Sequence, residues 1–354
     1  MPSLEVPGIL RADELVTTVD TIAALQLPNG MIPWFAGGHA DPWNHVEAAM
    51  ALLVGGRRSE AERAFDWLIR MQRPDGAWHH YYLADRVEQD KLEANVTAYV
   101  AAGVWHHWLL THDRGFLESL WPTVERAFDF VLDLQTPRGE IIWARHPDGT
   151  PWSFALLTGS SSICHSLRCA LAVAHEVGEE RPDWELSLAS LAAVIRARPD
   201  GAFAPKNRWA MDWYYPVLSG AISGDEARAH LAARWHTFIL PGHGVKCVSD
   251  RPWVTAAETC ELALAQIGVG NDASARELFG WAQQMRLDDG RYWTGTVYPE
   301  VVHFPDGEMS SYTAAAVVLC ADALAGATPA SGLFSHHDTL PEIIITDEDL
   351  SREH

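Results

Sequence analysis

MQRPDGAW (71–78) is one copy of a short phrase that recurs along the 354-residue chain. The other copies are LQLPNGMIPW (25–34), LQTPRGEIIW (134–143), RARPDGAF (196–203), MRLDDGRYW (285–293) and a weaker version, ILPGHGVKCVSDRPW (239–253). In each copy a turn rich in Pro, Asp and Gly separates an amphipathic stretch from an aromatic residue. Glycine fits the helix-ending position where φ is positive, and proline stops a helix. The copies follow one another at about 40–60 residues, a period typical of a helical-hairpin repeat.

Helical periodicity fills the intervals between these turns. We expect helices near 11–26, 42–55, 59–72, 91–110, 115–134, 161–177, 183–197, 214–222, 225–238, 253–268, 272–286 and 310–325. Helices that precede the turns carry Glu and Arg on one face, which is typical of outer helices. Helices that follow the long loops are small and apolar nearly all round, which is typical of buried helices. Short strands are expected only within EIIWARHPDG and VKCVSD.

This alternation predicts an all-α (α/α)6 barrel, in which six hairpins form an inner and an outer ring. The long loops, rich in Trp, Tyr, His and Asp, all fall on one face, where a ligand site is expected. We interpret residues 1–354 as one domain, although the length alone suggests about two. From about residue 326 the chain loses its periodicity and becomes acidic, and we expect a packed strap with a loose terminus.

The composition is that of a globular protein and excludes several partners. Hydrophobic residues make up 48% of the chain, and the formal net charge is −21. This charge repels nucleic acids and anionic membrane surfaces. The apolar helices are interrupted by polar residues and no signal peptide is visible, so neither a membrane span nor secretion is expected. Five cysteines without a CxxC pair favour a reducing compartment, and we predict a cytoplasmic protein with no sequence signal for its oligomeric state.

An acidic basin rich in Trp and Tyr suggests a carbohydrate ligand, because indole faces stack on sugar rings. Glycoside hydrolysis needs two carboxylates on opposite sides of the scissile bond. Asp41, in GGHADPWNHVEAAMALL, is one candidate. Its position before Pro42 equally fits a simple helix N-cap. Glu47, one turn further, is more easily understood as a buried polar anchor.

Glu258, in SDRPWVTAAETCELAL, is the second candidate. It falls near the start of an apolar inner helix, with Glu261 on the same face. Burial raises the pKa of a carboxyl group, which suits a general acid. The alternative is that Arg251 pairs with Glu258 in a purely structural ion pair.

Other polar and aromatic residues of the long loops are candidates for substrate binding. Asp90, Glu93 and Asn95 either bind hydroxyls or form a solvated helix start. The aromatic cluster around Asp212 and Trp213 is costly to bury without partners for its polar atoms, which favours a binding wall. The full set of expected stacking residues is Trp43, Trp213, Tyr214, Tyr215, Trp253 and Trp293, and the expected hydroxyl-binding residues are Asn44, His45, Asp90, Asp212 and Arg251.

Two further constellations are weaker. TGSSSICHS (158–166) contains Ser, Cys and His, but helix-capping serines and a core Cys164 explain it more simply. Cys247, Asp250 and His303 could imitate a zinc site, yet no HExxH and no phosphate-binding loop is present. We therefore expect neither a metal nor a cofactor.

The phrases GMIPWFAGGHADPWNHVEAAMAL, DKLEANVTAYVAAGVWHHWLL and GVKCVSDRPWVTAAETCELAL resemble an actinobacterial family that is often labelled prenyltransferase-like. That family includes the methylmannose polysaccharide hydrolases, endo-α-mannanases that act on cytoplasmic 3-O-methylmannose polymers. The resemblance covers residues from about 10 to 325. It implies an inverting α-mannosidase in which Asp41 and Glu258 are the catalytic carboxylates. We favour Glu258 as the acid, because its helix is more apolar. An oligosaccharide or polysaccharide is then the expected partner.

Two alternatives stay open at this stage. The hairpin pattern is also similar to the prenyltransferase and terpene-cyclase toroids, but LDDG (287–290) is not a DxDD acid motif. The long loops also offer few Arg and Lys residues for a diphosphate. A non-catalytic carbohydrate-binding scaffold is the other alternative, and it predicts sugar binding without any product.

Overall fold

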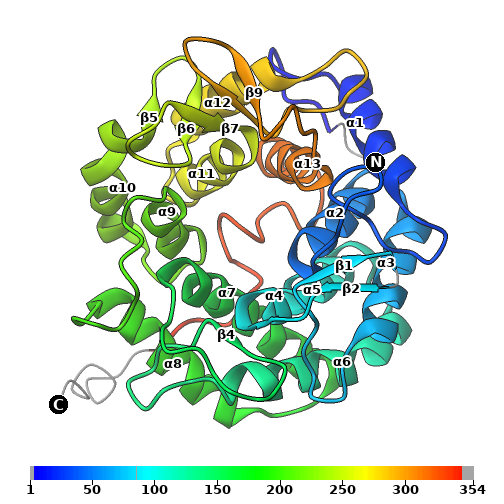
Figure 1. Cartoon of the computed structure of the whole chain (residues 1–354), viewed down its shortest axis with the longest axis vertical. Helices are drawn as coiled ribbons and strands as arrows, with labels where there is room; N and C mark the ends of the chain where they lie inside the picture. Colours follow the sequence, from blue (N-terminus) through cyan, green and yellow to red (C-terminus); the bar gives the residue numbers. More distant parts are fainter. Residues whose placement is uncertain (1–3, 85, 345–354) are drawn as a thin grey trace.

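The computed structural model describes residues 4–84 and 86–344, and helices dominate it (Figure 1). In this part of the chain the inner ring consists of α2 (Pro42–Val54), α4 (Ala94–Ala98) continued by α5 (Val100–Thr111), α7 (Leu157–Val177), α9 (Met211–Leu218), α11 (Ala256–Gly268) and α13 (Ser311–Ala325). Each inner helix contacts the next one, and α13 contacts α2, so the ring is closed. The loose terminus expected beyond residue 344 lies outside the described residues.

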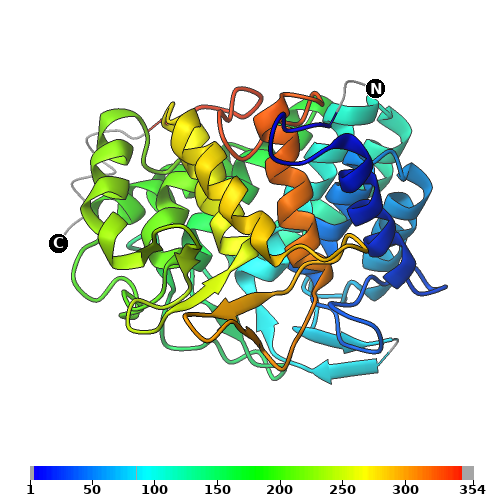
Figure 2. The same cartoon turned by 90° about the horizontal axis from the view of Figure 1, so that it is seen from above.

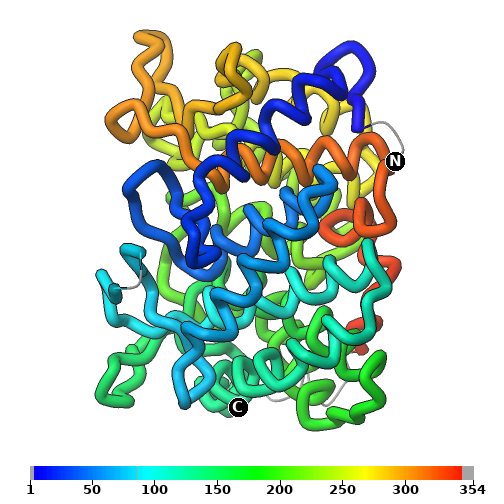
Figure 3. The backbone as a smooth tube through the Cα atoms, turned by 90° about the vertical axis from the view of Figure 1, so that its right-hand side faces the viewer, coloured from blue at the N-terminus to red at the C-terminus, as the bar shows by residue number. Residues whose placement is uncertain are grey.

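An outer helix covers each member of the inner ring. The outer helices are α1 (Ala12–Leu25), α3 (Arg58–Met71), α6 (Arg114–Leu132), α8 (Pro182–Ala197), α10 (Gly224–Phe238) and α12 (Asp272–Ala282), which the 3-10 turn η1 (Gln283–Met285) extends. Five hairpins join neighbours in sequence, and the sixth pairs the first helix, α1, with the last, α13 (Figure 3). The predicted (α/α)6 barrel is therefore confirmed.

The recurrent glycine turns hold neighbouring outer helices together. Gly76 has φ +90°, and a Cβ atom there would stand 1.9 Å from the carbonyl oxygen of Arg126 in the next outer helix. Gln72, just before this turn, donates from its side chain to the Gly76 carbonyl at 2.9 Å and to the Thr123 carbonyl at 2.9 Å. Only glycine combines this φ with so close an approach, which explains why the phrase recurs.

Short strands at the loop end were largely missed by the sequence prediction. They are β1 (Tyr81–Leu83) with β2 (Arg86–Gln89), β3 (Leu92–Glu93) with β4 (Ala144–Arg145), and an antiparallel sheet of β5 (Ile239–Leu240), β6 (Gly244–Lys246), β7 (Trp253–Thr255), β8 (Gly295–Val297) and β9 (Val302–Phe304). The expected helix 253–268 therefore starts only at residue 256, because residues 253–255 pair with β6 and β8. The expected helix 91–110 is divided into α4 and α5 at Tyr99.

The strap, residues 326–344, crosses the end of the ring opposite the long loops (Figure 2). His165 of α7 hydrogen-bonds the Leu333 carbonyl at 3.0 Å, and Arg168 donates to the Pro341 carbonyl at 2.9 Å. The Phe334 ring stacks on His165 at 4.8 Å. The strap thus closes one end of the ring and leaves the long loops around the other. Within the described residues, no helix has both the length and the apolar character needed to cross a membrane.

Candidate active site

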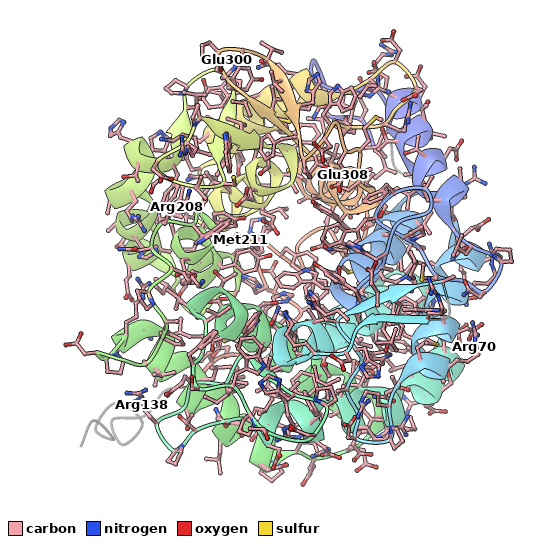
Figure 4. The ribbon with its side chains drawn as sticks, in the orientation of Figure 1. Arg70, Arg138, Arg208, Met211, Glu300 and Glu308 are labelled. Carbon is pink, nitrogen blue, oxygen red and sulfur yellow. The ribbon has the colours of Figure 1, made fainter. Side chains whose placement is uncertain are left out.

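A cavity of about 380 Å³ lies inside the ring at its loop end. Its walls contain Trp34, Asp41, Trp43, Asn44, Glu47, His80, Tyr81, Glu93, Asn95, Val96, Trp209, Met211, Cys247, Thr255, Ala257, Glu258, Glu261, Thr294, Tyr312 and Ala316. We call this space the main cavity. Five carboxylates therefore face one space, and in Figure 4 Met211 and Glu308 stand at the central opening, whereas Arg70 and Arg138 lie at the outer rim.

Asp41 both caps a helix and lines the main cavity. Its Oδ1 accepts from the backbone N–H of Asn44 at 3.0 Å, as an N-cap residue does at the start of α2. Its Oδ2 accepts from Trp34 Nε1 at 2.8 Å and from Asn44 Nδ2 at 2.7 Å. Burial raises the pKa of Asp41 above its ordinary value, and these hydrogen bonds oppose the rise. A helix N-cap and a cavity-lining carboxylate are compatible roles for Asp41, because Oδ1 caps α2 and Oδ2 bonds Trp34 in the aromatic wall.

Glu258 lies in the first turn of α11 and has fewer partners. Its Oε2 accepts from Thr255 Oγ1 at 2.5 Å. Burial raises the pKa of Glu258 to about 8, with a further contribution from the negative charge of Glu261. A carboxyl group with this pKa is protonated at neutral pH, so it can donate a proton to a bound ligand. The alternative partner, Arg251, is exposed and lies outside the main cavity wall.

Glu47 and Glu261 lie deeper in the main cavity as an acidic pair. Glu47 Oε1 accepts from Trp43 Nε1 at 2.9 Å and from Tyr99 Oη at 3.2 Å. Glu261 accepts from the hydroxyl groups of Tyr214 and Tyr215. Burial and the negative charge of Glu261 raise the pKa of Glu47. Each member of the pair is thus held by two donors from the protein.

A second cavity of about 270 Å³ adjoins the main cavity. Trp43, Glu93, Asn95, Trp209 and Met211 belong to both walls, so the two spaces lie side by side. The remaining wall of the second cavity consists of Trp143, Leu156, Thr158, Gly159, Lys206 and Asp212.

Two acidic side chains of the second cavity have defined partners. Asp212 Oδ1 accepts from Thr158 Oγ1 at 2.6 Å. Glu93 is paired with Lys91 at 2.6 Å, and the Lys91 ammonium group stands 4.2 Å from the centre of the Trp143 ring. Charged and aromatic groups therefore lie together along this wall, which suits a ligand with both C–H faces and hydroxyl groups.

Several expected binding residues are instead held within the protein. His45 is fully buried, and its ring nitrogens bond the backbone of Ile32 at 3.1 Å and of Ala64 at 2.9 Å. Trp213 stacks on Phe238 at 5.3 Å in the interior. The hydroxyl groups of Tyr214 and Tyr215 donate to Glu261, so these two rings support the acidic pair. Partners for these polar atoms were available inside the ring, which the sequence did not reveal.

The other expected residues lie at the periphery. Asp90 and Arg251 are exposed, and Trp253, 37% exposed, packs its ring at 5.7 Å from Phe304. Trp293 stacks on His303 at 4.2 Å. These positions are outside the two cavity walls given above. Of the expected set, Asp41, Trp43, Asn44 and Glu258 line the main cavity, and Asp212 lines the second.

The structure adds wall residues that the sequence prediction missed. The centre of the Trp34 ring lies 5.7 Å from that of Tyr81 and 5.0 Å from that of Tyr312, so three rings from distant segments of the chain meet in this wall. Trp34 ends the first turn phrase, so the phrase itself contained a signal for it. The zinc alternative is not supported by position, since Cys247 lines the main cavity whereas Asp250 pairs with Arg208 at 2.9 Å.

This closed double ring with an acid-lined cavity at its loop end defines a protein of the (α/α)6 toroid class. Solved structures of similar fold include a glycosidase variant in complex with glucose (TM-score 0.69, 14% identity, covering 89% of this chain and 97% of that chain). Another is the GH63 mannosylglycerate hydrolase from Thermus thermophilus (TM-score 0.68, 12% identity, covering 86% of this chain and 99% of that chain). At these identities the likeness establishes the fold.

Sequence comparison is more specific. The chain is 50% identical over 329 residues to the MMP endo-(1,4)-3-O-methyl-alpha-D-mannosidase of Mycolicibacterium hassiacum, covering 93% of this chain and 91% of that protein. The chain belongs to the family of this enzyme and is a glycoside hydrolase. A shorter match, 31% identical over 87 residues (23% of this chain and 14% of that protein), is to an uncharacterized glycosyl hydrolase of Methanocaldococcus jannaschii. No protein-family model matches the chain.

Proposed function

We propose that this protein is an inverting endo-α-mannosidase that cleaves a (1,4)-linked methylmannose polysaccharide, with Asp41 and Glu258 as its catalytic carboxylates. The observation that carries the proposal is that these two side chains, from the first long loop and the fifth inner helix, line the same cavity. The identity with the Mycolicibacterium hassiacum enzyme supports the substrate. Inversion predicts that the two carboxyl groups stand about 6.5–9.5 Å apart across the bound sugar.

Different surroundings support different roles for the two carboxylates. Glu258 has a single hydrogen bond and a pKa raised to about 8, which favours the proton donor to the departing glycosidic oxygen. Asp41 accepts three hydrogen bonds, all of which favour its ionised form. In our proposal ionised Asp41 removes a proton from water as that water attacks the anomeric carbon from the opposite face. The C–O bond to the leaving sugar breaks as Glu258 protonates it.

The second cavity supports cleavage within a chain. An endo-acting enzyme must hold sugars on both sides of the scissile bond, and the main cavity alone ends at the acidic pair. The second cavity extends the wall with Trp143 and with Asp212 for hydroxyl binding, and Trp209, which both walls share and which is 44% exposed, offers a ring for stacking. We propose that this extension accommodates sugar units next to the cleaved bond.

The isoprenoid alternative receives less support from the same wall. A diphosphate in the main cavity would face Asp41, Glu47, Glu93, Glu258 and Glu261. The ionised members of this set, such as Asp41 in our proposal, would repel a diphosphate strongly in this poorly hydrated space. The acidic lining therefore favours a neutral glycan over an anionic prenyl donor.

We also propose that the protein is cytoplasmic and that it consists of one domain. The five cysteines are free, and four of them are buried, which supports a reducing, cytoplasmic setting. We treat the described ring and strap as one catalytic domain without nucleic-acid or membrane partners.

The test is an assay of Asp41→Asn and Glu258→Gln on 3-O-methylated α-(1,4)-mannose oligosaccharides. Each variant should lose about 10²–10⁴-fold in kcat. Proton NMR of the first product should show the β-anomer, as inversion requires. Glu118→Gln, an exposed carboxylate on the outer helix α6, is the matched control and should retain full turnover. Wild-type turnover by either site variant would remove that residue from the mechanism.

A further inference from the structure

Besides Val96, Ala257 and Ala316, the walls of the two cavities contain two longer apolar side chains among acids, amides and aromatic rings. Met211, the first residue of α9, lines both cavities, and Leu156, just before α7, lines the second. Figure 4 shows Met211 at the central opening of the ring. Both side chains are half-buried, so they are not part of the sealed core. The proposed mechanism uses neither of them.

A polar group without a partner stands in the same wall. Asn95 is 6% exposed and belongs to both cavity walls, and its Oδ1 has no hydrogen-bond partner among the described residues. Gly159 of α7 is its neighbour in the wall of the second cavity, and a Cβ atom on this glycine would stand 3.5 Å from the oxygen. A buried amide oxygen without a partner costs free energy, so a ligand hydroxyl that donates to it is favoured.

We infer that Leu156 and Met211 form the surface that recognises a methoxy group of the substrate, while Asn95 holds a free hydroxyl of the same or the next sugar. The inference rests on the proposed function, since it names how this site distinguishes a methylated from an unmethylated mannose chain. A hydroxyl against these two side chains would lose its hydrogen bonds to water and gain none. A methoxy group has no hydrogen to donate, and its methyl group gains apolar contact.

The aromatic walls cannot make this distinction. Trp209 is 44% exposed, and a ring face stacks on the C–H groups of either sugar, whereas the Trp143 ring is covered by Lys91 and stacked on Phe154. Only side chains that meet the substituent itself can separate OCH₃ from OH. One methylene group in an apolar pocket changes kcat/KM by about 10–200-fold, and we expect the wild-type preference in this range.

The experiment compares two synthetic α-(1,4)-mannotetraoses, one 3-O-methylated and one not, as substrates of the full-length protein. Met211→Gln keeps the side-chain length but adds an amide, and it should lower the kcat/KM ratio of methylated to unmethylated substrate about tenfold. Leu156→Asn should shift the ratio in the same direction and serves if the first variant misfolds. Asn95→Leu should weaken both substrates equally and leave the ratio unchanged. Met71→Gln, at the end of outer helix α3 and half-buried as well, is the matched control and should keep the wild-type ratio.

The outcomes separate this inference from the proposed function. A ratio that stays within about twofold of wild type in folded Met211→Gln and Leu156→Asn overturns the inference while the mannosidase proposal stands. A wild-type ratio near one does the same. If wild type cleaves neither tetraose, the proposed function fails, and calorimetric binding of the two tetraoses then tests the recognition surface by the same ratio.

Discussion

Glu258→Gln tests whether a carboxyl group with a raised pKa is the proton donor of the proposed reaction. With a pKa of about 8, about 90% of Glu258 is protonated at pH 7. With its ordinary value of 4.5, only about 0.3% would be protonated, so burial increases the amount of available acid about 300-fold. Glutamine keeps the shape and can accept the Thr255 hydroxyl, but it has no proton to transfer. We expect kcat/KM on a methylated mannose oligosaccharide to fall about 10²–10⁴-fold.

The assay follows kcat/KM from about pH 4 to pH 10 in wild type and variant. The wild-type rate should fall as the pH rises through about 8, because Glu258 then loses its proton, and it should fall on the acid side as Asp41 becomes protonated. The variant should lose the basic limb. A 2,4-dinitrophenyl glycoside of the same oligosaccharide leaves without protonation, so Glu258→Gln should retain activity on it, whereas Asp41→Asn should be slow on both substrates.

Three results would refute this reasoning. A basic limb that persists unchanged in Glu258→Gln would assign that limb to another group. Equal losses on the natural and the dinitrophenyl substrate would show that Glu258 does not protonate the leaving oxygen. Rescue by the dinitrophenyl substrate in Asp41→Asn, but not in Glu258→Gln, would exchange the two roles.

Three further predictions concern the same helix and the turns. Thr255→Val removes the hydroxyl that lowers the pKa of Glu258, so the basic limb of kcat/KM should move to higher pH; an unmoved limb contradicts this. Between about pH 4.5 and 8 folded Glu258 keeps a proton that the unfolded chain releases, so the free energy of unfolding should fall as the pH rises through this window. The fall in wild type should exceed that in Glu258→Gln by on the order of 4 kcal/mol, as denaturant titrations at each pH would measure. Gly76→Ala should lower the free energy of unfolding by at least about 3 kcal/mol, because the new Cβ would clash with the Arg126 carbonyl. Gly201→Ala, where φ is +76° and the surrounding space is open, should lower it by about 1 kcal/mol. Equal melting temperatures of the two variants would contradict the packing argument.

The ring could be predicted from the sequence because its determinants are local. The turn phrase contains the glycine, the proline and the glutamine that bridges to the next outer helix, and Gln26, Gln72 and Gln135 make the same pair of bonds in successive turns. The five-stranded sheet β5–β9 could not be predicted in this way. Its strands have two or three residues, and the pairing of β7 with β8 joins residues 253–255 to residues 295–297, far along the chain.

The candidate site was predicted in part, for a reason visible in single residues. Asp41 and Glu258 lie at the starts of inner helices after long loops, and every such helix starts at the same end of the ring, so both had to lie near the opening. Which face of a short helix points inward is a different question. In α9 Trp213 packs on Phe238 of α10, whereas Met211 faces the opening. The orientation of α9 about its own axis therefore depends on contacts with α10, which no local sequence pattern encodes.

The strap explains why the opening is one-sided. Phe334 and the backbone of the strap occupy the end of the ring opposite the loops, directly beyond the acidic pair Glu47 and Glu261, which shares a small space with Phe334. The proposed glycan substrate would therefore bind across the mouth of the ring rather than thread through it. In our proposal the main cavity takes the sugar at the cleaved bond, and the adjoining second cavity takes its neighbours along the rim. In this geometry, cleavage inside a chain requires only that the rim stay open on both sides of Asp41 and Glu258.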